Sequence, residues 1–256
     1  MDKKNYDHFD LNNGCYFDLP FVQTQVQGAL DNSIFNYFNS CIIGVYLLHI
    51  KPIRLVKRWV IMEFQKDLSH LGWEEVRNRQ LQRMSLVSEW ASIAGIKEGS
   101  TLLDIGPGPG AFLNEYASLV GTNGKVIALE KSKEAIDYFL KTSNQPNVIT
   151  VCWNAEQPYN TEIHDIDVIT LTDVLHHAES ILDILKNVRT LSNVKTRILI
   201  SKFDPETQGA FGPPLTSRIP ISQLKSAILS IGFEVCREGK QDFEHYYLLL
   251  KTEPST

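Results

Sequence analysis

Three glycines at alternating positions follow a short apolar run in the middle of the chain, in the sequence TLLDIGPGPGAF at residues 101–112. The apolar run predicts a buried strand, the glycines predict a tight turn, and the residues after them predict the start of a helix. Without Cβ atoms, such a turn reaches positive φ angles and lets a ligand approach the main chain closely. The stretch therefore predicts an α/β fold that presents its backbone to a nucleotide-like ligand.

The residues around the glycines narrow the choice of ligand. The Gly-x-Gly-x-x-Ala spacing that begins at Gly106 also satisfies a dinucleotide fingerprint. A pyrophosphate, however, needs free N–H groups at such a turn, and Pro107 and Pro109 each remove one. Asp104 would place a carboxylate close to the phosphates. It suits a ligand that carries an amino group and a sulfonium better.

This stretch resembles the first motif of class I S-adenosylmethionine (SAM)-dependent methyltransferases. The resemblance implies that the loop wraps the methionine part of SAM and that Asp104 reaches its amino group. It identifies the glycine loop as a set of cofactor contacts: Gly106, Pro107, Gly108 and Gly110.

The resemblance implies further cofactor contacts after the next predicted strands. Glu130 ends the run KVIALE, and an acid at this edge of a parallel sheet can accept both ribose hydroxyls. Asn154 and Ala155 fall where the family commonly has Asp-Ala, and the Asn carbonyl can still accept a hydrogen bond from the adenine amino group. Lys131 and Thr172 complete the predicted cofactor set.

Two histidines follow the fourth predicted strand, in the sequence TDVLHH at residues 172–177. This stretch resembles the LHH signature of the ubiquinone/menaquinone-methyltransferase-like branch. Methyl transfer is an in-line displacement, so the protein supplies mainly alignment and proton removal, and a neutral histidine can take the proton. His176 is the first candidate for the general base or acceptor-orienting residue, and His177 is the second. The alternative that one or both only pack or cap the next helix stays open.

The predicted acceptor pocket combines His176 with three aromatic residues. Phe203 and Phe211 belong to the end of the fifth strand and the Pro/Gly-rich loop after it. Phe21 lies in an aromatic N-terminal segment, and in SAM enzymes such segments often cover the substrate pocket.

From residue 101 onward, predicted strands alternate with helices, which indicates right-handed crossovers and a parallel sheet covered on both faces. The strands are expected at 101–105, 125–130, 147–152, 166–171 and 197–201. The last two, at 233–238 and 245–251, have only a short link and must pair antiparallel. This pattern resembles the methyltransferase core, an α/β fold with a seven-stranded mostly parallel sheet, helices on both faces and a C-terminal antiparallel hairpin.

The chain is expected to have two parts. Residues 1–80 are predicted to form a helical N-terminal cap or lid that shapes the substrate pocket or makes a homodimer contact, with helices near 34–50 and 53–68. Residues 81–256 are predicted to form the SAM-binding methyltransferase core. A third helix is expected over residues 73–94 and leads into the core.

Composition argues against several other classes of protein. The net charge of −5 gives no general attraction to nucleic acid or anionic membranes, and the four scattered cysteines suggest no metal site. The apolar run at 41–50 is shorter than the roughly 20 residues that a membrane span needs. We therefore expect a cytoplasmic protein with a small-molecule acceptor, no nucleic-acid partner and no favoured membrane contact.

Together these features predict a SAM-dependent methyltransferase that acts on O or N of a small, secondary-metabolite-like molecule and releases S-adenosylhomocysteine. Three alternatives stay open. The acceptor could be a hydrophobic quinone or lipid at a membrane surface, or a peptide natural product. The chain could also be a SAM-binding regulator without turnover. The sequence does not identify the acceptor or the methylated atom.

Overall fold

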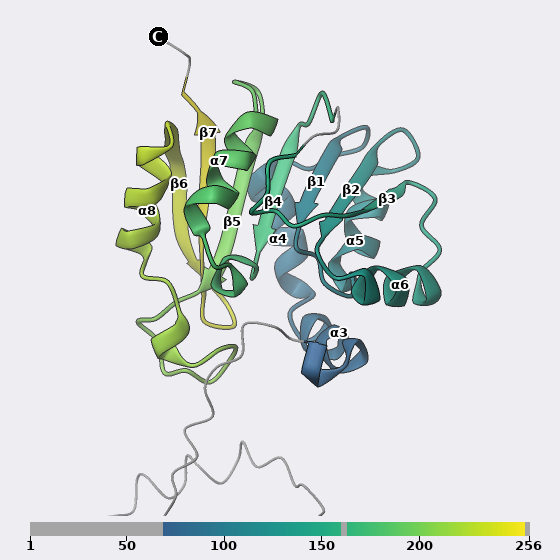
Figure 1. The fold of residues 1–256 in the computed structure, drawn as a ribbon. Helices are drawn as coiled ribbons and strands as arrows, with labels where there is room; N and C mark the ends of the chain where they lie inside the picture. Colours follow the sequence, from purple (N-terminus) through teal and green to yellow (C-terminus); the bar gives the residue numbers. More distant parts are fainter. Residues whose placement is uncertain (1–68, 160–162, 254–256) are drawn as a thin grey trace, which may run out of the picture. The chain divides into compact units, whose positions relative to one another are not determined.

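The computed structural model describes residues 69–159 and 163–253 (Figure 1). The helices expected at 34–50 and 53–68, and the pocket residue Phe21, lie outside these residues. Among the described residues, no helix is long and apolar enough to cross a membrane.

Seven strands form one sheet in the order β3-β2-β1-β4-β5-β7-β6. Strands β1 to β5 pair in parallel, whereas β7 runs antiparallel to both β5 and β6, so the predicted sheet and its C-terminal hairpin are confirmed. The strands are β1 (Thr101–Ile105), β2 (Lys125–Glu130), β3 (Val148–Cys152), β4 (Val168–Thr172), β5 (Arg197–Phe203), β6 (Phe233–Gln241) and β7 (His245–Thr252).

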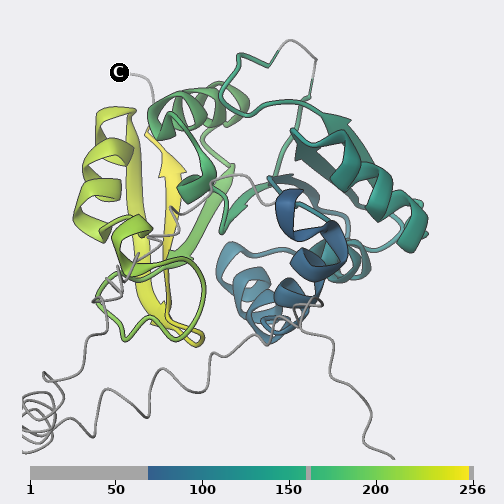
Figure 2. The same cartoon turned by 60° about the horizontal axis from the view of Figure 1, so that its bottom comes forward.

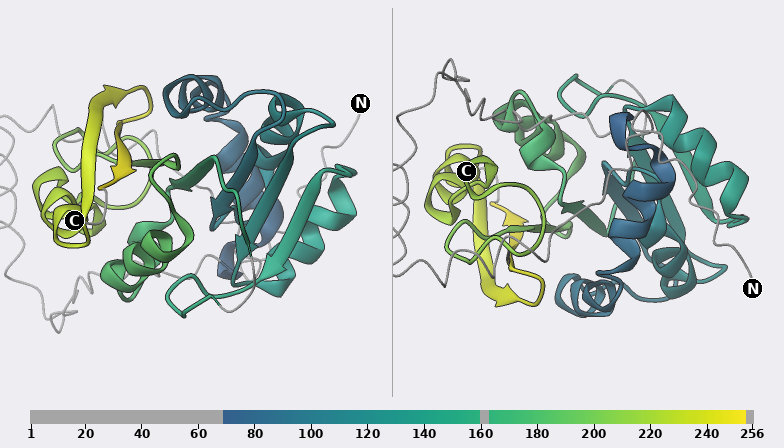
Figure 3. Two further views of the ribbon diagram at one scale, coloured as in Figure 1. Left: turned by 90° about the horizontal axis from the view of Figure 1, so that it is seen from above. Right: turned by 90° about the horizontal axis from the view of Figure 1, so that it is seen from below.

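Helices cover both faces of the sheet and bury a separate apolar cluster on each (Figure 3). One cluster joins the sheet to α4, α5 and α6, and the other joins it to α7 and α8. The bounds are α3 (Trp73–Leu81), α4 (Ser85–Ala94), α5 (Ala111–Val120), α6 (Lys133–Thr142), α7 (Ile181–Leu191) and α8 (Ile221–Ser230), with short 3₁₀ turns η2 (Ser69–Leu71), η3 (Leu175–His177) and η4 (Leu215–Ser217). Val, Ile and Leu dominate the parallel strands because both faces of the sheet are covered.

The single helix expected over residues 73–94 is wrong, because the structure divides it into α3 and α4. Between them, the N–H groups of Arg83 and Met84 bond to the carbonyls three residues earlier instead of four. This tighter spacing ends the α-helical ladder. No proline marks the break in the sequence, so nothing in the local pattern indicates it.

The parallel strands all end at one edge of the sheet, which Figure 2 brings toward the viewer. The chain crosses from β1 to β2 on one side, and β4 lies on the other side of β1. Ligands of open α/β sheets bind at such a switch in strand order, outside the carboxyl ends of the strands. The residues at this edge are therefore the candidates for a site.

Candidate active site

Asp104 is a buried acid that lacks a full set of partners. It lies near the end of β1 and is 1% exposed. Its Oδ1 accepts a hydrogen bond from Thr170 Oγ1 at 2.7 Å, while its Oδ2 is buried without a hydrogen-bond partner among the described residues. Burial raises the pKa of Asp104 from 3.8 to about 7; Thr170 opposes this shift and Glu130 adds to it. A cationic donor at Oδ2 would satisfy this acid.

The glycine loop uses its own N–H groups internally. Its two prolines have no N–H, and each of the other backbone donors from 106 to 111 already has an acceptor. These pairs are Gly106 to Leu129 O (2.8 Å), Gly108 to Glu130 Oε2 (2.9 Å), Gly110 to Pro107 O (3.2 Å) and Ala111 to Gln80 Oε1 (3.0 Å). A pyrophosphate would have no free donor here, so the loop is not a dinucleotide cradle.

Close packing explains why this loop needs glycine. Gly106 has a φ of 73°, and a Cβ atom there would come within 2.3 Å of Val174 Cγ2. Gly110 has a φ of 75°, and its Cβ would lie 2.5 Å from Phe139 Cδ2. At Gly108, by contrast, the nearest atom to an added Cβ is Gln80 Nε2 at 3.5 Å.

Glu130 fastens this loop to the end of β2. Its two carboxylate oxygens accept the N–H groups of Gly108 and Ser132, both at 2.9 Å. The side chain is 7% exposed. A carboxylate has about four acceptor positions, so two bonds leave capacity for the ribose hydroxyls that the sequence predicts there.

Gln80, near the end of α3, holds the loop from the other side, and sequence analysis missed it. Its Nε2 donates to Pro107 O at 2.8 Å, and its Oε1 accepts from Ala111 N at 3.0 Å. Ala111 is the first residue of α5, so Gln80 also satisfies one of the helix donors that would otherwise lack a partner. A lone glutamine in a polar helix carries no motif that would indicate this contact.

The other predicted cofactor residues lie along the same edge. Thr172 is buried at the end of β4, and Lys131 is exposed after β2. Asn154 is exposed after β3, where its Oδ1 accepts from Glu156 N at 3.0 Å, and Ala155 beside it is half-buried. The adenine contact of Asn154 stays a prediction.

Directly after β4, Asp173 lies beside buried basic side chains that come from distant parts of the chain. It has a φ of 55° and accepts from His245 Nε2 at 3.0 Å, and Arg83 approaches it at 3.5 Å. Burial alone would raise the pKa of Asp173, but His245, Arg83 and Lys202 outweigh it and hold the pKa well below its ordinary value. Nδ1 of His245 also contacts Phe243 O at 2.8 Å, so both ring nitrogens of His245 face oxygen atoms that can accept hydrogen bonds.

His176, the predicted base, lies beside this cluster. Its Nδ1 is hydrogen-bonded to Nζ of Lys202, a β5 residue that is 1% exposed. The His177 ring centroid lies 4.0 Å from that of His176. Burial, Lys202 and His177 hold the pKa of His176 well below 6.5, so His176 is neutral near neutral pH.

The two described aromatic residues of the predicted pocket lie in different surroundings. Phe203 is 4% exposed; its ring centroid lies 4.1 Å from that of His245, and guanidinium groups of Arg83 and Arg218 lie against its ring. It therefore packs inside the charged cluster. Phe211 is 42% exposed and packs edge-on against Phe243.

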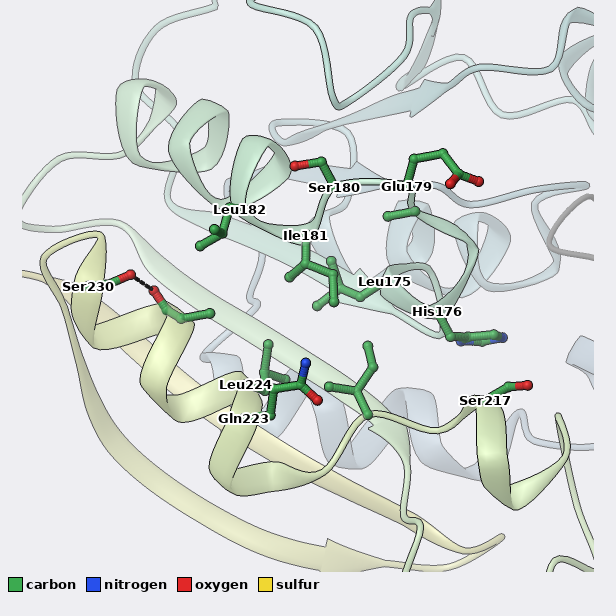
Figure 4. A pocket seen from close by; sticks show the side chains of 13 residues that line it. Leu175, His176, Glu179, Ser180, Ile181, Leu182, Ser217, Gln223, Leu224 and Ser230 are labelled. Atoms are coloured by element: carbon green, nitrogen blue, oxygen red, sulfur yellow. Dashed lines mark hydrogen bonds between the residues drawn. The ribbon is translucent and has the colours of Figure 1, made fainter.

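A cavity of about 630 Å³ opens next to His176, between α7 and α8 (Figure 4). Figure 4 shows His176 at one end, near Ser217, with Leu182 and Ser230 toward the other end. Apolar side chains form much of the lining, including Leu175, Ile181, Leu182, Ile219, Leu224 and Ala227. Such a lining suits the apolar body of a small ligand.

Comparison with known proteins settles the family. The sequence model of a family described as "Methyltransferase domain" matches residues 96–241, more than half of the chain. The chain belongs to this family. It is a class I SAM-dependent methyltransferase, whereas its place in the ubiquinone-like branch stays a prediction. A search of curated proteins finds no match.

Solved structures share the fold of this methyltransferase at low sequence identity. A SAM-dependent methyltransferase from Aquifex aeolicus has a TM-score of 0.58 and 22% identity, over 64% of this chain and 88% of that one. The [4+2]-cyclase SpnF has a TM-score of 0.57 and 13% identity, over 67% and 81%. The O-methyltransferase NcsB1, in complex with S-adenosylhomocysteine and 1,4-dihydroxy-2-naphthoic acid, has a TM-score of 0.51 and 16% identity, over 62% and 50%.

SAM is the cofactor of the methyltransferase, and Asp104, Glu130 and the glycine loop between them fit it. Asp104 Oδ2 would accept from the ammonium of the methionine part, and Glu130 retains acceptor capacity for the ribose. Bound SAM supplies a methyl group that is activated by the sulfonium.

Proposed function

We propose that the methyltransferase methylates an oxygen or nitrogen atom of a small molecule. The observation that carries the proposal is the position of His176. It is a neutral histidine at the end of a largely apolar cavity, at the same sheet edge as Asp104 and the glycine loop.

The chain's own residues would divide the work as follows. The cavity between α7 and α8 takes the apolar body of the acceptor, and His176 removes the proton from its O–H or N–H group. The acceptor atom then forms its bond to the methyl carbon, and the electron pair of the broken bond stays on sulfur. The rigid edge of the sheet aligns the two reactants, which is the main requirement for an in-line displacement.

The preference for a small molecule rests on the site and on one structural neighbour. Among the described residues that line the cavity, Glu179 and His176 are the ionisable ones, and none of them forms a basic stripe. The solved complex of NcsB1, an O-methyltransferase, holds 1,4-dihydroxy-2-naphthoic acid, an aromatic small molecule. A homodimer, a cytoplasmic location and the absence of nucleic-acid and membrane partners remain parts of this proposal.

The experiment is an assay of S-adenosylhomocysteine release with SAM and a panel of phenols, aromatic carboxylic acids, amines, quinols in liposomes, and short peptides. We expect product with at least one soluble phenol, acid or amine, and a loss of about 100-fold or more in His176→Gln, the range of a missing general base. His164→Gln, at an exposed histidine before β4, should keep full activity.

The alternatives give different outcomes in the same assay. Product only with liposomes or only with peptides would contradict the small-molecule acceptor. Binding of S-adenosylhomocysteine without turnover on any member of the panel would favour a SAM-binding regulator.

A further inference from the structure

Lys202 is a buried lysine to which the proposed reaction assigns no role. It lies on β5 with Ile198 and Ile200 on the same face of the strand, and 1% of its surface is exposed. Its Nζ meets Nδ1 of His176. Burial lowers the pKa of Lys202 to about 7, although Asp173 opposes this shift.

The contact between Lys202 and His176 couples their protons. An ammonium has three donors and no acceptor, so a charged Lys202 forces Nδ1 of His176 to accept. Neutral His176 then carries its proton on Nε2, and that nitrogen cannot act as a base. A neutral Lys202 amine can instead accept from Nδ1–H, and Nε2 of His176 then has the lone pair.

Other charged and titratable groups around the pair come from several elements. Asp173 follows β4 and favours the charged lysine, whereas Arg83, between α3 and α4, opposes a charge on His176. Among the described residues, these groups include Arg83, Asp173, His177 of η3, Glu179 of the cavity lining, and His245 and Tyr246 of β7. Asp173 is therefore placed to stabilise an ammonium that forms during the reaction.

We propose that Lys202 is a positioning residue that makes His176 a base: its neutral amine holds the Nδ1–H tautomer and receives that proton as Nε2 takes the proton of the acceptor. This proposal rests on the proposed function. The acceptor O–H or N–H bond breaks and its proton moves to Nε2, while the Nδ1 proton moves to Nζ. The acceptor bonds to the methyl carbon, sulfur keeps the electron pair, and the positive charge of SAM ends on Lys202 near Asp173.

The tautomer of His176 tests this proposal without any acceptor. Long-range ¹H–¹⁵N correlation spectra of the full chain with ¹⁵N-labelled histidine distinguish Nδ1–H from Nε2–H rings. In the presence of S-adenosylhomocysteine, we expect Nε2–H for His176 at about pH 5.5 and Nδ1–H at about pH 9, because Lys202 loses its proton between these values. His176→Gln assigns the resonance, and His177→Gln controls for its neighbour.

Two variants separate a proton-sharing role from simple packing. Lys202→Met removes the amine at similar length, and Lys202→Arg keeps a permanent charge. Both should show Nε2–H at both pH values. A wild-type tautomer that does not change with pH, or a change that persists in either variant, would overturn the proposal. If Lys202→Met does not fold, Lys202→Arg and the wild type still decide it.

Binding of S-adenosylhomocysteine distinguishes a failure of this proposal from a failure of the proposed function. S-adenosylhomocysteine should bind Lys202→Arg and the wild type with the same affinity, because Lys202 is not among the residues assigned to the cofactor. A failure to bind it at all would contradict the proposed function. Normal binding with an unchanging tautomer would contradict only the role of Lys202.

Discussion

Two buried aspartates lie at the same edge of the sheet in opposite states. Asp104, on the cofactor side, has an oxygen without a hydrogen-bond partner among the described residues and a pKa raised to about 7. Asp173, on the acceptor side, faces His245, Arg83 and Lys202 and has a pKa well below its ordinary value. Basic side chains of the protein itself lie beside Asp173, whereas the amino group of a ligand would be the cation beside Asp104. The contrast distinguishes Asp173, which stabilises the structure, from Asp104, which binds the cofactor.

The largest expected effect is on the acceptor side. Asp173→Asn leaves the cations of Arg83 and His245 buried without their carboxylate, and should lower the free energy of unfolding by roughly 3–5 kcal/mol. Denaturant unfolding measures this, with Asp183→Asn, at an exposed ion pair on α7, as a control that should leave the stability almost unchanged.

The pH dependence of that loss follows from the direction of the shift. A carboxyl with a depressed pKa contributes stability above its unfolded pKa of about 3.9 and loses the contribution as pH falls through the native value. The wild type and Asp173→Asn should therefore converge in acid. A constant difference across pH would contradict the ion-pair account.

Asp104→Asn should have the opposite effect on stability. Because the native pKa of Asp104 is raised, the folded state binds more protons than the unfolded one, and the wild type loses stability as pH rises from about 4 to about 7. At about pH 8, without cofactor, the variant should be more stable by roughly 2–4 kcal/mol. Equal stability of the two proteins at that pH would show that Asp104 has a partner after all.

A smaller effect is expected at Gln80. Gln80→Ala removes two hydrogen bonds to the glycine loop and should cost about 1 kcal/mol of stability and a 3- to 10-fold loss in affinity for S-adenosylhomocysteine. Thermal unfolding and calorimetry measure these, with Gln82→Ala, at an exposed neighbour, as a matched control. A loss of stability with unchanged affinity would mean that α3 does not order the loop for the cofactor.

The cofactor side could be predicted from the sequence because its residues are close together in the chain. Asp104, the glycine loop and Glu130 belong to one strand–turn–helix–strand unit, and the motif specifies where they meet. Their hydrogen bonds could not be predicted. Gln80 reaches the loop from a separate helix, and Glu130 holds the loop through Gly108.

The acceptor side could not be predicted in the same way, because strand order assembles it. His245 meets Asp173 only because β7 lies between β5 and β6, an arrangement that the hairpin pattern does not specify. Arg83 comes from the break between α3 and α4, which the sequence does not mark. Lys202 lies one residue beyond the strand expected at 197–201, so its place on the same strand face as Ile198 and Ile200 was not predicted.

The most direct test of the account is calorimetric titration with S-adenosylhomocysteine at about pH 6 and about pH 8, in the wild type and Asp104→Asn. Because the ammonium of the ligand needs an ionised Asp104, the wild type should bind roughly tenfold more tightly at the higher pH. Asp104→Asn should bind weakly at both. Wild-type affinity in Asp104→Asn, or no binding by either protein, would contradict the assignment of this edge as the SAM site.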